Sequence, residues 1–235
     1  MENSDNQVYD SIAILLANRS FIYHLLQSIY ADEPNRELME VVLDNHTREA
    51  LNLIAEDDDD FNNFYGLLDR LSSDMQKDAP ETIDKLKTEY TYLMIGPAEL
   101  VAPPWESVYI LKEPLIFQES TLKVRQAYLE YDFLPAGYPN EADDHIALEL
   151  HFMAHLARLA LEYFEAGEYE KVISLLEDQK KFLIEHLLVW ISDFAADMQK
   201  SKSHYFYPAV ALLTEKVIII DEKVLDEIIL FLKSS

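Results

Sequence analysis

The sequence predicts an all-α protein, a helical bundle of about nine to eleven helices in two closely joined parts. Two observations lead to this fold class. The 235 residues include only four glycines, although 49% of the residues are hydrophobic. Apolar residues also recur at the helical period of 3.6 over long stretches of the chain. Rare glycine and this period together favour helices that pack their apolar faces on one another.

Polar breaks separate the helices predicted in the first part of the chain. Asp32, Glu33 and Pro34 end the first helix, because proline cannot continue a helix. The aspartate run at residues 57–60 is read as a loop whose carboxylates favour the positive end of the next helix. The helices predicted here cover residues 6–30, 36–55, 61–75 and 81–95.

Proline also interrupts the middle of the chain. Residues 96–118 hold four prolines and therefore cannot form one continuous helix. Further on, Asp143 or Asp144 is the expected N-cap of a long helix that reaches Gly167. This helix is apolar on two sides, which predicts a central position in the bundle. The other helices predicted after the proline-rich segment cover residues 120–133, 168–200, 204–220 and 222–233.

We expect an N-terminal helical part at residues 1–117 and a C-terminal helical part at residues 118–235, sharing one interface. The chain carries 44 acidic and 19 basic residues, a net charge of −25. Nucleic acid is therefore not an expected partner, because phosphate binding requires many cations. A basic ligand is attracted by such a field. The alternative is that the acidity serves only solubility.

The location of the protein is predicted from what the chain lacks. There is no cysteine, which removes disulfides and thiolate chemistry and suits a reducing compartment. Residues 1–5 are acidic and lack the basic start of a secretory signal. No apolar run approaches the roughly 20 residues of a membrane span. We therefore expect a cytoplasmic protein without stable membrane insertion, present as a monomer or homodimer.

No residue pattern predicts an enzyme. No histidine follows a glutamate by three residues, as carboxylate-bridged di-iron bundles require. His151 and His155 are four residues apart, but they lack the intervening glutamate of the zinc-protease pattern. Ser107 with Asp144 and His145 suggests a triad, yet no Gly-x-Ser-x-Gly turn supports it. We expect no catalytic residues, no metal and no cofactor.

Two short segments remain as candidates for binding. Trp105 lies in a Pro-Pro-Trp turn, and a rigid loop with an aromatic ring is a good anchor for an apolar side chain of a peptide. Glu106, Asp143 and Asp144 offer bidentate acceptance of guanidinium groups. In the alternative interpretation, Trp105 packs under its loop, Asp143 caps the helix, and His145 holds the two loops together.

Several motifs in order resemble the cytoplasmic twin-arginine signal-peptide chaperones of the TorD/DmsD type, over about residues 90–221. The motifs are Tyr92-Leu93-Met94-Ile95-Gly96-Pro97, Pro103-Pro104-Trp105-Glu106-Ser107-Val108-Tyr109, Ser120-Thr121-Leu122-Lys123-Val124-Arg125, Asp143-Asp144-His145 and Glu149-Leu150-His151-Phe152-Met153-Ala154. Phe182, His186, Leu187, Trp190 and Phe194, followed by Phe206-Tyr207, resemble the last helices of that family. The chain departs from the family pattern at Ala142, where proline is usual, and at Met94-Ile95, where Leu-Phe is usual.

The resemblance implies a chaperone that binds the twin-arginine signal peptide of a molybdenum-containing oxidoreductase subunit. Such a chaperone assists cofactor loading and maturation before export, so its partners are the leader peptide and the molybdoenzyme precursor. The residues expected to bind the peptide are Pro104, Trp105, Glu106, Ser107, Tyr109, Asp143, Asp144, His145 and Glu149.

Two alternatives to this function remain open. The first is a nitrate-reductase-type assembly chaperone that acts on a non-exported catalytic subunit. The second is a helical metal-dependent enzyme that uses the cluster of Asp143, Asp144 and His145.

Overall fold

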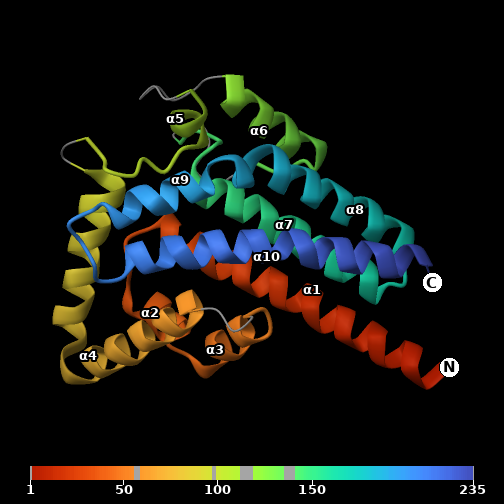
Figure 1. Ribbon diagram of the computed structural model, residues 1–235, viewed down its shortest axis with the longest axis horizontal. Coiled ribbons are helices and arrows are strands. Elements are labelled where there is room, and N and C mark those ends of the chain that lie inside the picture. The colour runs from red at the N-terminus through yellow and green to blue at the C-terminus, as the bar shows by residue number, and fades with distance from the viewer. Residues whose placement is uncertain (1, 56–58, 97–98, 112–118, 135–140, 235) are drawn as a thin grey trace.

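The computed structural model describes residues 2–55, 59–96, 99–111, 119–134 and 141–234. All regular elements in these ranges are helices, which confirms the all-α fold class (Figure 1). The division predicted between residues 117 and 118 falls at residues outside the described ranges.

The first predicted helix is α1 (Glu2–Ala31), but the second is two helices, α2 (Arg36–Val42) and α3 (Asn45–Asn52). The prediction of one helix over residues 36–55 was therefore wrong. Asp44 has extended backbone angles, and its side chain accepts a hydrogen bond from the backbone N–H of His46 at 2.7 Å. This N-cap geometry starts a new helix.

The helices predicted over residues 61–75 and 81–95 belong to α4 (Asp59–Tyr90), which turns a corner between them (Figure 1). Asp78 at the corner has non-helical angles, with φ −155° and ψ 87°. Its side chain accepts the backbone N–H of Glu81 at 3.1 Å. The second arm of α4 therefore begins with a cap of its own.

The chain leaves α4 through a π-helical segment, η1 (Thr91–Ile95), which ends at Gly96. Gly96 has φ 83°, a left-handed conformation that glycine adopts without steric cost. Two short helices follow, α5 (Glu106–Leu111) and α6 (Glu119–Glu130). The long helix that was predicted to reach Gly167 is α7 (Ile146–Glu165).

The helix predicted over residues 168–200 is observed as one helical stretch with a π-helical interruption. It consists of α8 (Tyr169–Phe182), η2 (Leu183–Leu187) and α9 (Leu188–Gln199). The last element is α10 (Tyr207–Ser234), a single helix where two helices were predicted with a break at Asp221. That prediction was wrong, because Asp221 is buried in an ion pair.

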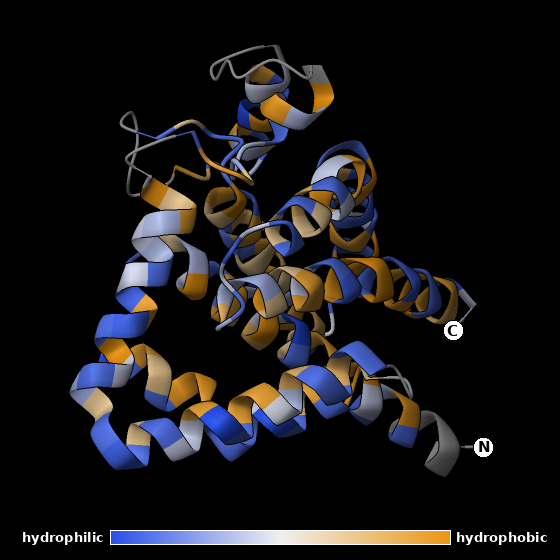
Figure 2. Cartoon of the chain, turned by 60° about the vertical axis from the view of Figure 1, so that its left-hand side comes forward, coloured by the Kyte–Doolittle hydropathy of each residue, from blue (hydrophilic) through white to orange (hydrophobic). Residues whose placement is uncertain are grey.

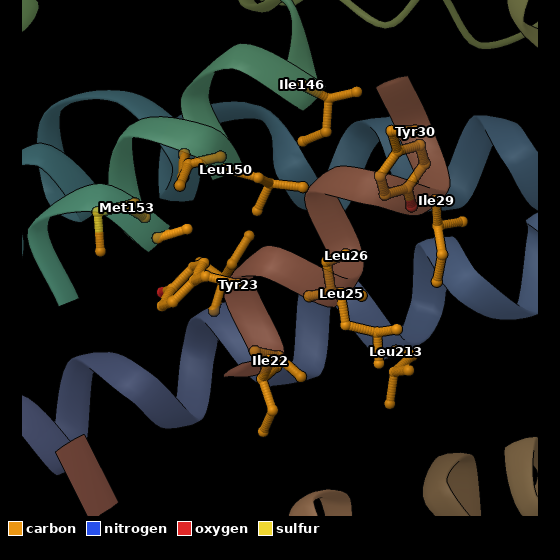
Figure 3. Packing of buried hydrophobic residues seen from close by; sticks show 14 of the residues in the cluster. Ile22, Tyr23, Leu25, Leu26, Ile29, Tyr30, Ile146, Leu150, Met153 and Leu213 are labelled. Carbon is orange, nitrogen blue, oxygen red and sulfur yellow. The ribbon is translucent and has the colours of Figure 1, made fainter. Parts of the chain in front are cut away.

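The core forms where α1 lies between α7 and α10 (Figure 3). Leu26 and Tyr30 of α1 are fully buried, as are Leu150 and Met153 of α7. The expected central position of the long helix α7 is thus confirmed: its buried residues include Leu150, Met153 and Phe152 on two sides.

One part of α1 also meets the length and hydropathy of a membrane span. Among the described residues, Gln7–Ala31 is that segment, with a mean hydropathy of 1.2, and half of the tested window is buried inside the protein. The sequence expectation did not single it out. Its packing on α7 and α10 is that of a core helix.

A buried ion pair joins α1 to α10. The Arg19 guanidinium donates to Asp221, with Nε–Oδ1 at 2.5 Å and Nη2–Oδ2 at 2.9 Å. Arg19 also donates to the Gln179 side chain at 2.7 Å, and the Tyr23 hydroxyl donates to Asp221 at 2.7 Å. These bonds connect α1, α8 and α10 within the core, where charged groups are stable only when paired.

We predict that Asp221→Ala lowers the free energy of unfolding by about 3–5 kcal/mol, because Arg19 is left buried without its counter-charge. Urea unfolding measures this change. As a control, Glu177→Ala breaks a half-exposed pair with Lys233 and should cost at most about 1 kcal/mol. Equal losses in the two variants would contradict the structural role given to Asp221.

Candidate peptide-binding site

The two predicted loops meet in the structure. Trp105 and His145 form an isolated antiparallel β-bridge. The Glu106 N–H donates to the Asp144 carbonyl at 3.0 Å, and the Ile146 N–H donates to the Pro104 carbonyl at 2.9 Å. The segment that leads into α5 is thereby fixed to the start of α7. We call this contact the loop junction.

The fully buried side chain of Asp144 adds hydrogen bonds to the loop junction. One carboxylate oxygen accepts the Ser107 N–H at 2.9 Å, and the other accepts the Thr121 hydroxyl at 3.0 Å. The carboxylate therefore ties the first turns of α5 and α6 to the start of α7.

Asp143 is also buried, at 2% exposure. Its carboxylate accepts the Arg125 Nε–H at 2.6 Å, and its backbone carbonyl accepts the Tyr128 hydroxyl at 2.8 Å. Burial raises the pKa of Asp143, and the neighbouring Arg125 opposes that rise. Both acids of the motif thus hold α6 against α7.

The N-cap of α7 is His145, so the expectation of Asp143 or Asp144 at this position was wrong. The His145 Nδ1 accepts the Ala147 N–H at 3.1 Å. Burial lowers the pKa of His145, although Glu141 and Asp144 act in the opposite direction. The ring is therefore neutral near pH 7, as an accepting Nδ1 requires.

Trp105 is partly exposed at the loop junction. Its Nε1–H donates to the Glu141 carboxylate at 3.0 Å, and its ring lies edge-on to the His145 ring at a centroid distance of 5.5 Å. Glu141 and His145 are partly exposed as well. We call these three side chains the Trp105 patch. Glu141, which the sequence did not single out, orients the indole ring.

A buried acidic cluster lies beneath the Trp105 patch. The Glu106 carboxylate is 3.0 Å from His186 Nδ1, and Glu149 accepts the Trp190 Nε1–H at 3.3 Å. Burial raises the pKa of Glu149 well above its usual 4.5, and the negative charges of Glu106 and Asp144 raise it further. Glu149 therefore keeps its proton at a pH where exposed glutamates are ionised.

Of the other predicted site residues, Pro104 and Ser107 are buried and Tyr109 is partly buried. The Tyr109 ring stacks on Trp190 at a centroid distance of 5.4 Å. The Ser107 and Tyr109 hydroxyls are buried and have no hydrogen-bond partner within the described part of the chain. Trp105 and His145 are thus the predicted side chains with exposed surface at the loop junction itself.

The predicted acids do not converge on one point. Asp143 faces Arg125, Asp144 faces Ser107 and Thr121, and the His145 Nδ1 faces the backbone of α7. Within the described ranges, no group of three or more His, Asp or Glu side chains is placed to hold a metal ion. This geometry gives no support to the metal-dependent enzyme alternative.

We predict that Glu149→Gln becomes more stable relative to the parent as the pH rises from about 5 to about 8. Above the usual pKa of 4.5, the folded parent binds more protons at Glu149 than the unfolded chain does. The free energy of unfolding of the parent therefore falls as the pH rises through this window. Glutamine does not titrate, so the variant does not lose this stability. Urea unfolding across the window measures the difference.

The control for this prediction is Glu227→Gln, which changes an exposed glutamate of α10. Its stability difference from the parent should not vary with pH. A pH-independent difference for Glu149→Gln would show that Glu149 titrates alike in the folded and unfolded chains.

Comparison with known proteins identifies relatives of this chain. Residues 54–196 match the model of the family described as nitrate reductase delta subunit. A probable Tat proofreading chaperone DmsD from Haemophilus influenzae is 38% identical over 130 residues, which are 55% of this chain and 57% of that relative. The chaperone protein TorD of Shewanella piezotolerans is 26% identical over 83% of this chain and 86% of its own length.

A TorD chaperone of Vibrio cholerae is also 26% identical, over 93% of this chain and 96% of the relative. The chain therefore spans most of the TorD relatives but little more than half of the DmsD relative. These relatives are named as chaperones and not as enzymes. The match to the family model covers more than half of the sequence, so the chain belongs to the nitrate reductase delta subunit family, together with chaperones of the TorD and DmsD types.

Proposed function

We propose that this protein is a cytoplasmic chaperone for a molybdenum-containing oxidoreductase. It binds the twin-arginine leader peptide of the precursor and shields it until cofactor insertion is complete. The observation that carries the proposal is the Trp105 patch, a rigid aromatic surface in a member of a family whose matched relatives are named as Tat proofreading and TorD chaperones.

The rigidity of the patch favours binding. The Trp105 ring is oriented by Glu141 and His145, and its backbone is fixed by the loop junction. A side chain that is ordered before the ligand arrives loses little conformational entropy on binding. Tryptophan is also among the residues that most often dominate binding energy.

The predicted peptide-binding residues have two roles in this proposal. Trp105 and His145 contact the apolar stretch of the leader, and the partly buried Tyr109 supports the loop through its stacking on Trp190. The buried residues hold these rings in place through the contacts described above. They are Pro104, Glu106, Ser107, Asp143, Asp144 and Glu149.

The net charge of −25 supports a basic ligand. Long-range attraction speeds the encounter with a peptide that carries paired arginines. The chemistry of the interaction is non-covalent throughout: the chaperone covers the leader and releases it intact.

The family description favours a second candidate function. In that function the protein assembles a nitrate reductase and engages a catalytic subunit that is not exported. The same patch would bind an apolar segment without an arginine pair. The two candidates differ in the peptide that binds.

We predict that Trp105→Ala weakens leader binding by roughly 2 kcal/mol or more, because the aromatic anchor is lost at the centre of the contact. Titration calorimetry with synthetic leaders of oxidoreductases encoded in the same genome measures the loss. Leu230→Ala is the matched control, since it removes an apolar side chain that is 72% exposed on α10. It should bind as the parent does.

Three results bear on the proposal. Binding of an arginine-pair leader that depends on Trp105 supports it. Binding only of a segment from a non-exported catalytic subunit favours the second candidate. A parent protein that binds none of these peptides would rule out the chaperone proposed here.

A further inference from the structure

A second surface lies away from the Trp105 patch, at the corner of α4. There the second arm of α4 and the segment before α10 enclose a groove of about 1000 Å³. The side chains that matter here are Asp78, Glu81, Asp84, Lys85, Tyr92, Lys202 and Tyr205. We call it the corner groove. Figure 2, which brings this side forward, shows mostly hydrophilic residues around the corner of α4.

The far wall of the corner groove is fixed by one buried carboxylate. Glu89 of α4 accepts the backbone N–H groups of Tyr205 at 3.1 Å and Phe206 at 2.9 Å, and it also accepts the Ser203 hydroxyl. These bonds attach residues 203–206 to α4. The groove is therefore formed before any ligand binds, which reduces the entropic cost of binding.

The groove is mainly apolar inside, and at its edge three exposed acids outnumber two exposed lysines. Tyr92 is 44% exposed, and Tyr205, which lines the same groove, is partly exposed. Asp78, Glu81 and Asp84 are exposed along α4. A groove that presents both tyrosine rings and carboxylates suits a guanidinium group, which stacks on rings and pairs with acids.

These acids differ from the acids of the loop junction. Glu106, Asp143 and Asp144 are at most 2% exposed, and protein groups already occupy their carboxylates. A cationic ligand would have to displace those partners. The carboxylates of Glu81 and Asp84 are exposed and can be reached by a cationic ligand. Glu81 also forms an ion pair with Lys85.

The corner groove and the Trp105 patch are formed in part by neighbouring segments of the sequence. Tyr92 belongs to η1, which leads towards the loop that carries Trp105. The negative charge of Glu141 in the patch also acts on Tyr90, the last residue of α4. Burial raises the pKa of Tyr90 to about 12, and Asp32, Glu33 and Glu141 contribute to that rise. One extended peptide would have to span the two surfaces past η1.

We infer that the corner groove binds the arginine pair of the leader while its apolar stretch lies on the Trp105 patch. The inference rests on the proposed function and adds the subsite for the basic end of the peptide. Charge complementarity selects this occupant: an apolar groove edged by exposed acids fits a cationic and partly apolar segment.

Two substitutions in the groove change its charge in opposite directions. Asp84→Asn removes an exposed carboxylate, and its backbone carbonyl still accepts the Thr88 hydroxyl. Lys85→Gln removes an exposed cation and frees Glu81. The first should weaken binding of the arginine pair about two- to fivefold, and the second should strengthen it by about the same factor.

The probes are two synthetic peptides measured by titration calorimetry. Both carry the same run of leucine and alanine, one after an arginine pair and one after a glutamine pair. Asp84→Asn and Lys85→Gln should change the affinity of the arginine peptide alone. Glu227→Gln and Lys223→Gln are matched controls on the exposed far part of α10 (Figure 1) and should leave both affinities unchanged.

The outcomes separate this inference from the proposed function. If the parent binds the arginine peptide and both groove variants bind it equally well, the subsite is overturned and the chaperone function stands. If the groove instead receives a second copy of the chain, Asp84→Asn changes the sedimenting mass but not the peptide affinity, which also overturns the subsite. A parent that binds neither peptide overturns both.

Discussion

The Asp144 carboxylate is the interaction on which the candidate site depends. It accepts hydrogen bonds from Ser107 and Thr121, and thus from the starts of α5 and α6. Together with the backbone bonds of the loop junction, it fixes Trp105 beside His145. Because α7 is packed against α1 in the core, the aromatic patch is attached to a helix with many buried residues. Removal of one buried acceptor would leave two donors unpaired, which costs more than a surface bond.

The acidic residues of this protein have two separate tasks. Asp143, Asp144 and Asp221 are buried and join helices. Exposed acids such as Asp84 remain available to solvent and ligands. A net charge of −25 therefore does not by itself locate a binding site for cations. We infer one cation site where exposed acids adjoin an apolar groove, whereas the Trp105 patch offers a partly exposed tryptophan next to buried acids that are already paired.

Much of the fold could be predicted because helix periodicity and breaks are local signals. The two arms of α4 were separated correctly, since Asp78 and the proline beyond it mark a new start. The break at Asp44 was missed because a single capping residue inside a polar stretch carries little weight. The continuity of α10 was missed because Asp221 is neutralised by Arg19, 202 residues away in sequence. No local pattern reports such a pairing.

The candidate site could be predicted only in part, because the roles of its residues also depend on contacts between distant parts of the sequence. The motifs identified the two loops, but not that His145 would cap α7 or that Asp144 would face α6. These roles depend on which helices become neighbours. The most direct test is the free energy of unfolding of Asp144→Asn in urea. A loss of about 1–3 kcal/mol is predicted, because the amide cannot accept both bonds. Unchanged stability would contradict the structural role of the Asp144 carboxylate and would favour a role in ligand binding.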